Sequence, residues 1–482
     1  MQSYQYSTQP YEHQRKAFDE SWAAEYYALF MEMGTGKSKV VIDTIGALFE
    51  SGKIKAALII APKGVYDNWV RGELPLHLPE RIDHQIFRWS PTRTQRYEQE
   101  LADFIVSREP RLKVFVMNIE AFSSQRGTDA ATAFLYQNPD NIMVVDESTT
   151  IKNRRAARTK NVIALQGRAK YRRILTGSPI TQSPMDLFSQ CSFLSEDALG
   201  YRSYYAFQGR YAMVQRRVMG HRSFQQIVGY RRLDELSCKL DRFSNRALKT
   251  ECLDLPVKVY TRREVELTPE QARLYAQMKK LALAQLDNGE LATTASVLTQ
   301  IMRLQQICCG HLQPDDGEIL TLKNNRLSGL LDVTEELQGK AIIWATYTYD
   351  VQQVASALRD RFGTEAVATY FGATPQEQRQ EIVESFQDPD SPLRFFVGQP
   401  KTGGFGITLT AANTVIYYSN SYDLEIRLQS EDRAHRIGQT NKVTYVDLVA
   451  PGTVDEKILE ALRNKIDLAG KVLKEEAREW LS

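Results

Sequence analysis

A glycine loop near the N-terminus is the first candidate for chemistry. It lies in the segment MEMGTGKSKVVIDT, from Met31 to Thr44. The apolar, aromatic run Tyr26 to Met33 predicts a buried strand, and helical spacing of apolar residues follows the loop. A strand, a glycine loop, a Lys-Ser pair and a helix in this order are typical of a loop that binds nucleotide phosphates. The candidate residues are Gly34, Thr35, Gly36, Lys37 and Ser38.

These loop residues have distinct expected roles. The glycines let backbone N–H groups close on phosphate oxygens, Lys37 is expected to reach the β- and γ-phosphates of ATP, and Ser38 is expected to bind Mg²⁺. The general pattern has a glycine where Met31 stands. The alternative is an ordinary glycine turn before a helix, which the preceding strand and the Lys-Ser pair disfavour.

A pair of carboxylates could catalyse hydrolysis of the bound nucleotide. The segment NIMVVDEST, Asn141 to Thr149, is an apolar strand that ends in Asp-Glu. In this arrangement Asp146 is expected to hold Mg²⁺ through water, and Glu147 to orient and deprotonate the attacking water. The alternative is a solvated acidic turn. The occurrence of this acidic strand end together with the glycine loop disfavours that alternative. A kinase uses a different lysine and different loops.

Two arginines in the C-terminal third are candidates for the γ-phosphate. The segment LQSEDRAHRIGQ runs from Leu428 to Gln439. If it is helical, Gln429, Arg433 and Arg436 share one face, because they are four and three positions apart. Paired arginines suit a phosphate as arginine fingers. A solvated basic face explains the charges but not this spacing.

The last segment resembles the final motif of the Swi/Snf (sucrose non-fermenting) family of superfamily-two helicase-like ATPases. The chain resembles a minimal bacterial- or phage-type member along nearly its whole length. The resemblance implies an α/β fold with two RecA-like parallel-sheet lobes, helical insertions between them, and ATP between the lobes. It also implies adenine recognition by Gln14 in PYEHQRKAF and nucleotide binding that involves Gln429.

Further motifs acquire roles from the same resemblance. It implies DNA contact by Pro62 and Lys63 of APKGVYDNW. It also implies DNA contact by the first three residues of a second-lobe motif that begins KTGGFG, namely Lys401, Thr402 and Gly403. In ILTGSPI, three residues are expected to couple the ATP site to the nucleic-acid face: Thr176, Gly177 and Ser178. One departure stands out, since Thr149 occupies a position where the family usually has His.

The spacing of the motifs predicts four regions. These are an N-terminal ATP-binding lobe (1–195), a basic aromatic helical protrusion (196–255), a helical element leading into the second lobe (256–324), and a C-terminal lobe with a closing helix (325–482). Helices are predicted in LTPEQARLYAQMKKLALAQL, with Pro269 near its start, and in SVLTQIMRLQQICCGHL. The long insertion disfavours an RNA helicase of the DEAD-box type.

The predicted protrusion is basic. Residues 201–250 contain 11 Lys or Arg against 3 Asp or Glu, interleaved with aromatic residues. This composition favours nucleic-acid binding, and the alternative is a protrusion whose aromatic residues form a small core of its own. Adjacent arginines are expected at solvent or DNA because burying unpaired charge is costly; they are Arg216, Arg217, Arg231 and Arg232. A second basic block, Lys152 to Arg173, is either a solvated face or a phosphate contact.

Composition sets the broad class. The chain has 482 residues, 43% hydrophobic and 25% charged, with a net charge of only +2. The five cysteines form no CxxC pair, so neither a zinc site nor a disulfide framework is indicated. No apolar run reaches the length of a membrane span, and the first residues do not resemble a secretory signal. A cytoplasmic protein, bacterial or in an infected host, is expected.

The sequence therefore predicts an ATP-dependent translocase on double-stranded DNA that acts as a monomer, with ATP and Mg²⁺ as cofactors. One alternative is an enzyme that acts at forks by branch migration or annealing. An alternative of another class is an ATP-gated nucleic-acid-binding switch with slow turnover, which the intact Glu147 and the paired arginines disfavour. The sequence predicts neither the pathway nor any protein partner.

Overall fold

The computed structural model describes residues 4–63, 65–219, 222–253, 255–287, 294–314, 317–403 and 407–473. The chain divides into two compact units. The first comprises Met1–Val214, Ile227–Asp254 and Leu468–Glu476, and the second comprises Gln215–Gln226, Leu255–Asp467 and Ala477–Ser482. Within the described ranges, no helix is both long enough and apolar enough to span a bilayer.

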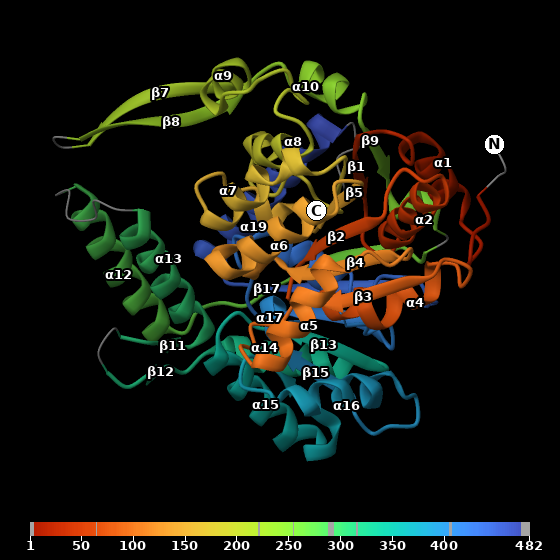
Figure 1. Ribbon diagram of the computed structural model, residues 1–482. Helices are drawn as coiled ribbons and strands as arrows, with labels where there is room; N and C mark the ends of the chain where they lie inside the picture. Colours follow the sequence, from red (N-terminus) through yellow and green to blue (C-terminus); the bar gives the residue numbers. More distant parts are fainter. Residues whose placement is uncertain are drawn as a thin grey trace. The chain divides into compact units, whose positions relative to one another are not determined.

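The first unit is built on a seven-stranded sheet in the order β3-β4-β2-β5-β6-β1-β9 (Figure 1). All of its strand pairs are parallel. The strands are β1 (Tyr26–Met31), β2 (Ala56–Ala61), β3 (His84–Arg88), β4 (Leu112–Asn118), β5 (Asn141–Asp146), β6 (Tyr171–Leu175) and β9 (Ser244–Ala247). Parallel strands bring their carboxyl ends to one edge of the sheet, where ligands of such folds bind.

Helices cover both faces of this sheet, which is why its strands are continuous apolar runs. In β1, Tyr27 and Leu29 join one core with α1, α2 and α4, whereas Ala28 and Phe30 join the other core with α5 to α10. The helices are α1 (Glu12–Ser21), α2 (Lys37–Glu50), α3 (Tyr66–Asn68), α4 (Leu74–His77), α5 (Gln95–Val106), α6 (Gln125–Gln137), α7 (Ala157–Ala164), α8 (Leu187–Leu194), α9 (Tyr204–Tyr211), α10 (Leu233–Leu240) and α11 (Lys249–Cys252).

The second unit contains a six-stranded parallel sheet in the order β10-β17-β16-β13-β15-β14. Its strands are β10 (Lys258–Glu264), β13 (Lys340–Trp344), β14 (Val367–Tyr370), β15 (Phe395–Gly398), β16 (Ala412–Tyr417) and β17 (Val443–Val449). Its helices are α12 (Pro269–Asp287), α13 (Thr294–Cys309), α14 (Asn325–Glu336), α15 (Thr348–Phe362), α16 (Gln376–Gln387), α17 (Pro400–Gly403), α18 (Leu424–Glu431) and α19 (Val454–Leu473). A small antiparallel pair joins β11 (His311–Leu312) to β12 (Leu320–Thr321).

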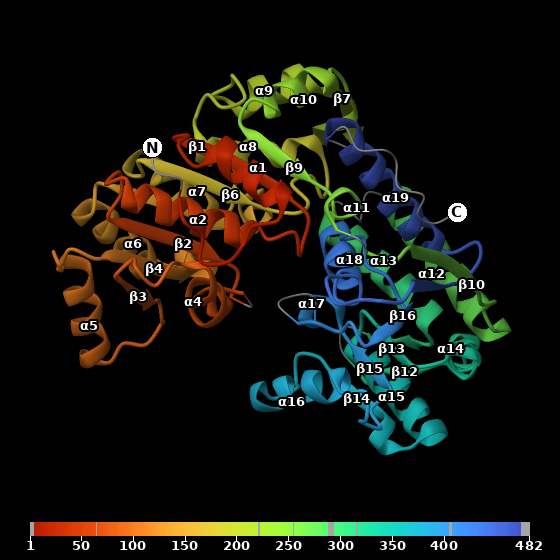
Figure 2. The same ribbon diagram turned by 90° about the vertical axis from the view of Figure 1, so that its right-hand side faces the viewer.

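The predicted α/β class with two parallel-sheet lobes is confirmed, and so are the two helices that begin near Pro269 and Thr294. These helices, α12 and α13, lie side by side in both views (Figures 1 and 2). The region predicted as helical before the second lobe also contains β10, which pairs with β17 and belongs to the second sheet. Periodicity missed β10 because its pairing partner lies far along the chain.

The basic protrusion is not simply helical, and that prediction is wrong. Between α9 and α10 the chain forms a two-stranded ribbon of β7 (Ala212–Met219) and β8 (Arg222–Tyr230) (Figure 1). Both strands contain β-branched or aromatic residues, which favour β-structure; they are Val214, Val218, Phe224, Ile227, Val228 and Tyr230. β9, at the end of the same region, is an edge strand of the first sheet.

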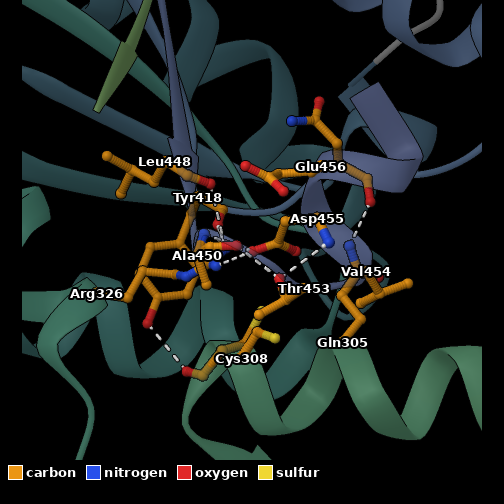
Figure 3. A network of polar contacts seen from close by, with 12 residues as sticks. Gln305, Cys308, Arg326, Tyr418, Leu448, Ala450, Thr453, Val454, Asp455 and Glu456 are labelled. Atoms are coloured by element: carbon orange, nitrogen blue, oxygen red, sulfur yellow. Dashed lines mark hydrogen bonds and ion pairs between the residues drawn. The ribbon is translucent and has the colours of Figure 1, made fainter. Parts of the chain in front are cut away.

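A buried ion pair braces the second unit (Figure 3). Arg326, at the start of α14, pairs with Asp455 of α19, and the two side chains are 1% and 5% exposed. Arg326 also donates to the carbonyl oxygen of Tyr418 at 2.7 Å. Asp455 accepts from the backbone N–H of Ala450 at 3.1 Å. The pair therefore ties α14 and α19 to the chain that leaves β16 and β17.

Candidate functional site

The glycine loop has the predicted geometry between β1 and α2. Gly34 and Gly36 adopt left-handed φ angles of 80° and 87°, which favour glycine. α2 begins at Lys37 with Gly36 as its N-cap, and glycine has no side chain that could cap the first N–H groups of the helix. A helix N-terminus of this kind attracts phosphate through its N–H groups and its dipole.

Contacts within the loop fix its shape. The Thr35 hydroxyl donates to the Glu32 carbonyl oxygen at 2.7 Å, and the Lys37 ammonium donates to the same oxygen at 3.2 Å. Gln14 lies against the loop, and its Nε2 donates to the Thr35 carbonyl oxygen at 3.0 Å. A Cβ on Gly36 would lie 2.1 Å from that Nε2 and would displace the Gln14 amide, while the left-handed φ of Gly36 itself favours glycine. Gln14 therefore contacts the loop directly, and its adenine role stays a prediction.

β9 and the residues that follow it also contact the loop and β1, which the sequence did not predict. The backbone N–H of Lys249 donates to the Glu32 carboxylate at 2.7 Å. The guanidinium of Arg246 donates to the Phe30 carbonyl oxygen at 2.7 Å and to the Gly177 carbonyl oxygen at 2.9 Å. One arginine thus joins β1, the strand that leads into the glycine loop, to the TGS segment (Thr176, Gly177 and Ser178), although it lies more than two hundred positions from β1 along the chain.

The two carboxylates stand at the end of β5 at the same edge of the sheet. Asp146 and Glu147 are 6% and 8% exposed. One oxygen of Asp146 accepts from the backbone N–H of Glu147 at 2.9 Å, and the other accepts from the Trp69 indole at 2.8 Å. Burial raises the pKa of Asp146, while the Trp69 N–H and the positive charge of Lys37 act in the opposite direction.

Glu147 has a strained backbone. Its φ and ψ of 47° and 63° lie in the left-handed region, which is uncommon for a residue with a side chain and is found preferentially at functional sites. Its carboxylate accepts a hydrogen bond from the Thr176 hydroxyl at 3.2 Å, and that hydroxyl in turn accepts from the Ser178 backbone N–H at 3.2 Å. The structure therefore brings the TGS segment to the candidate general base.

The oxygen donors at this edge fit Mg²⁺. Ser38 lies in the first turn of α2 and supplies a hydroxyl, and Asp146 supplies a carboxylate. Mg²⁺ prefers such oxygen ligands and keeps several waters. Both Asp146 oxygens already accept a hydrogen bond, which fits a carboxylate that holds the ion through water.

The arginine segment of the second unit differs from the predicted helix. α18 ends at Glu431, so Arg433 and Arg436 lie in turns after it and do not share a helical face with Gln429. The Arg433 Nε folds back and donates to the Gln429 carbonyl oxygen at 3.0 Å, which satisfies a carbonyl of the last helical turn. The shared-face prediction is therefore wrong.

The three residues differ in their exposure and contacts. Arg433 is 2% exposed, and its Nη1 donates to the Ile407 carbonyl oxygen at 3.1 Å. Gln429 is buried and its amide lies 3.4 Å from the Glu425 carboxylate. Arg436 is half-buried. Arg433 thus contributes to the local structure as well as to any ligand contact.

A buried charge network, which the sequence analysis missed, holds α18. Arg427 donates to Glu431 at 2.9 Å and to Asp447 of β17 at 2.5 Å. Glu431 also accepts from Lys258 at 3.2 Å and from the Tyr260 hydroxyl at 2.8 Å, both on β10. Arg427, Glu431 and Asp447 are at most 3% exposed. The network fixes the helix from whose end Arg433 emerges.

The residues predicted to contact DNA lie in different environments. Pro62 is buried at the end of β2 and Lys63 beside it is exposed. In α17, Lys401 is exposed, Thr402 is half-buried and Gly403 is buried. The exposed lysines are free to meet phosphates, whereas Pro62 and Gly403 shape the backbone.

The arginines of the ribbon region are mostly accessible, as predicted. Arg216, Arg231 and Arg232 are exposed. Arg217 belongs to β7, and its side chain lies outside the described residues. Arg231 donates to the Gly209 carbonyl oxygen at 2.7 Å, so part of its bonding capacity serves the fold.

The second basic block divides into internal and surface residues. Arg173 is fully buried and donates to the carbonyl oxygens of Ser21 and Ala24 at 2.6 and 2.8 Å. Burial lowers the pKa of Arg173 to about 9. Arg154 instead lies 4.0 Å above the ring of Tyr204 in α9. Neither of the two interpretations of this block, solvated face or phosphate contact, describes Arg173.

Comparison with protein families decides the assignment. The model of the SNF2-related domain matches residues 27–312, and that of the helicase conserved C-terminal domain matches residues 322–438. The chain belongs to the SNF2-related family. The matched ranges include the glycine loop, both carboxylates and the segment that carries Arg433 and Arg436.

Relatives of this SNF2-related chain are found in bacteria and eukaryotes. The Bacillus subtilis protein YwqA, which carries the name of an ATP-dependent helicase/translocase, is 27% identical over 94% of this chain and 46% of its own length. The mouse DNA annealing helicase and endonuclease ZRANB3 is 28% identical over 92% of this chain and 38% of its own length. The chain therefore spans less than half of these relatives.

A solved structure also matches the SNF2-related chain. It is the Sulfolobus solfataricus SWI2/SNF2 ATPase core in complex with dsDNA, with 24% identity and a TM-score of 0.43. The match covers 98% of this chain and 94% of that one.

Proposed function

We propose that this chain is an ATP-dependent translocase on double-stranded DNA. The observation that carries the proposal is the joint placement of the glycine loop, Asp146, Glu147 and Thr176 at one edge of the first sheet, in a chain of the SNF2-related family. The name of the Bacillus subtilis relative, an ATP-dependent helicase/translocase, supports the same activity.

The proposed roles in the first unit follow from its geometry. Lys37 and the N–H groups of the loop bind the β- and γ-phosphates, and Ser38 and Asp146 hold Mg²⁺, which neutralises phosphate charge when bound. Glu147 orients the attacking water and takes its proton. The Thr176 hydroxyl positions the Glu147 carboxylate through their 3.2 Å contact. Gln14 connects the loop to the adenine end of the nucleotide.

Arg433 and Arg436 are proposed to stabilise the charge on the γ-phosphate during hydrolysis, with Gln429 as their support. Guanidinium groups bind phosphate oxygens in a fixed planar geometry, which suits this role. The hydrogen bond from the Arg433 Nε to the Gln429 carbonyl oxygen supports this role of Gln429, because it holds the Arg433 guanidinium in place. A cycle of nucleotide binding and hydrolysis then alternates the grip of the two units on DNA.

The proposed DNA contacts are made to the backbone of one strand. Lys63 and Lys401 contribute charge, while Pro62, Thr402 and Gly403 shape the segments that carry it. The ribbon arginines add a second basic surface. Phosphate contacts carry little sequence information, so binding should be independent of sequence and should weaken steeply with salt.

A second candidate is an enzyme that anneals strands or migrates branches at forks. The mouse relative's name, DNA annealing helicase and endonuclease, favours this activity. It shares the ATP chemistry of the first proposal and differs only in the DNA structure on which it acts.

A parallel assay of ATP hydrolysis with duplex DNA, single-stranded DNA, forked DNA and RNA tests these proposals. Strong stimulation by duplex DNA, together with displacement of a third strand from a triplex, is expected. Stimulation confined to forks would favour the annealing activity. Stimulation by RNA alone would contradict both, and binding without hydrolysis would indicate an ATP-gated switch.

A further inference from the structure

Trp69 contacts the carboxylate proposed to hold Mg²⁺, although no motif role was assigned to it. Its side chain is fully buried, and its indole Nε1 donates to the Asp146 carboxylate at 2.8 Å. The two residues are 77 positions apart in the chain. The other Asp146 oxygen accepts from the Glu147 backbone. Trp69 is therefore the one side-chain hydrogen-bond donor to Asp146 among the described residues.

Trp69 ends a short segment whose other end is exposed. The segment leaves β2 at Pro62 and Lys63, and the backbone N–H groups of Val65 and Tyr66 donate to the Pro62 carbonyl oxygen at 2.8 and 3.0 Å. The helix α3 follows, and a π-helical turn then begins at Trp69. π-helical turns are rare and frequently mark functional sites. One continuous piece of chain therefore joins the exposed Lys63 to the buried indole.

We infer that Trp69 is a positioning residue that fixes the orientation of Asp146 and transmits DNA binding at Pro62 and Lys63 to the magnesium site. The inference rests on the proposed function, because it takes Mg²⁺ as the ion held by Asp146 and duplex DNA as the ligand of Lys63.

The chemistry of the contact suits this role. A hydrogen bond to an ionised carboxylate is stronger than one between neutral groups, so the indole holds the carboxylate firmly. Because the indole is neutral, it orients Asp146 without cancelling the negative charge that attracts the ion. A movement of the segment on DNA would shift the indole and, with it, the Asp146 oxygen that it holds.

The variant Trp69→Phe tests the inference, because it keeps an aromatic ring in the core and removes the N–H. Trp89→Phe is the matched control, since Trp89 is also buried in the first unit, where it packs against Phe115 and the Arg126 guanidinium. Binding of a fluorescent ATP analogue is measured in EDTA and at rising Mg²⁺. ATP hydrolysis is measured with and without duplex DNA.

Mg²⁺ should increase the affinity for the ATP analogue. For Trp69→Phe, the Mg²⁺ concentration that gives half of this increase should rise about tenfold, as expected for the loss of a hydrogen bond to a charged group. The affinity in EDTA and the affinity for duplex should stay unchanged, while the stimulation by duplex falls about tenfold. Trp89→Phe should match the wild type in the Mg²⁺ midpoint, the nucleotide affinity in EDTA, the affinity for duplex and the stimulation by duplex. An unchanged Mg²⁺ midpoint, or an equal loss of affinity in EDTA, would overturn the role at Asp146. Full stimulation by duplex would overturn the transmission.

Fluorine spectra of the unmutated chain keep the inference testable if Trp69→Phe does not fold. The chain has five tryptophans, so 5-fluorotryptophan labelling gives five signals. Mn²⁺ with nucleotide should broaden the signal of the indole beside Asp146, and duplex DNA alone should shift that same signal. The absence of a signal that shows both effects would overturn the inference. Failure of the proposed function is distinguishable, because it appears as wild-type hydrolysis that duplex DNA does not stimulate.

Discussion

In the first unit, Asp146 and Glu147 each accept hydrogen bonds from neutral groups, whereas in the second unit buried ion pairs hold the helix that precedes Arg433. Asp146 accepts from an indole and a backbone N–H, and Glu147 accepts from a hydroxyl. The end of α18 instead depends on Arg427 and its two carboxylate partners.

The difference follows from what each region must do. Neutral donors orient a carboxylate without competing with a bound cation for its oxygens, whereas a positively charged partner on those oxygens would compete with the ion. An arginine can be positioned by any rigid helix, and buried ion pairs make α18 rigid at the cost of desolvation. We therefore expect mutations in the first unit to damage chemistry and mutations in the α18 network to damage stability.

The largest effect should come from Glu147→Gln. Without the general base, hydrolysis should fall by about 10³ or more, while ATP still binds. Lys37→Ala should instead abolish productive ATP binding. Single-turnover hydrolysis and direct binding of a fluorescent ATP analogue separate the two. The exposed Glu80→Gln serves as the control, and near-normal turnover of Glu147→Gln would remove Glu147 from its role.

Arg433→Ala and Arg436→Ala should each reduce hydrolysis by about 10³, as for other arginine fingers, with ATP binding to the first unit retained. They should differ in stability. Removing the Arg433 hydrogen bonds to two carbonyl oxygens should lower the free energy of unfolding by about 1–3 kcal/mol, and the half-buried Arg436 should contribute less than the buried Arg433. Denaturant unfolding measures this. Wild-type hydrolysis in both variants would show that neither arginine reaches the phosphate.

Asp447→Ala should break the α18 network. Arg427 would keep Glu431 but lose its β17 partner, and removing one member of a buried pair costs about 3–5 kcal/mol. ATP binding to the first unit should persist, since the glycine loop and Lys37 lie there. The exposed pair Arg96 and Glu100 supplies the control, because Glu100→Ala should change stability by less than about 1 kcal/mol. Equal effects would show that the network does not stabilise the unit.

The smallest effect should come from the ribbon region. Changing its four arginines to Glu should weaken duplex binding and flatten its salt dependence by about one unit of slope for each phosphate that is no longer neutralised; they are Arg216, Arg217, Arg231 and Arg232. Hydrolysis without DNA should not change. The exposed Arg93 and Arg96, changed to Glu, provide the control. An unaltered affinity and slope would identify a solvated face.

The sequence predicted the local structure around the candidate site, and the roles of its residues stay predictions. Gly36, Lys37, Asp146 and Glu147 lie where their motifs placed them, because a phosphate-binding loop and an acidic strand end are local structures. The sequence did not predict contacts that depend on tertiary packing. Trp69 reaches Asp146 from 77 positions away, and Lys258 on β10 reaches an acid at the end of α18.

Two local predictions also failed, for reasons visible in the backbone. The helix α18 stops at Glu431, and the side chain of Arg433, two positions later, donates to a carbonyl oxygen of its last turn. The ribbon could not be predicted from periodicity, because neither β7 nor β8 alternates apolar and polar residues. Both errors arose where a functional pattern was taken as evidence of a helix.

The pairing of β10 with β17 has a consequence for biosynthesis. Lys258 of β10 pairs with Val443 of β17, so β10 has no pairing partner until about 185 further residues have been made. At about 5–20 residues per second, the ribosome needs roughly 10–40 s for that stretch. During this time the nascent β10 offers unpaired N–H and C=O groups to any neighbouring strand. The mainly charged outer half of β10, Thr261–Glu264, protects against such pairing, because charged edge strands resist aggregation.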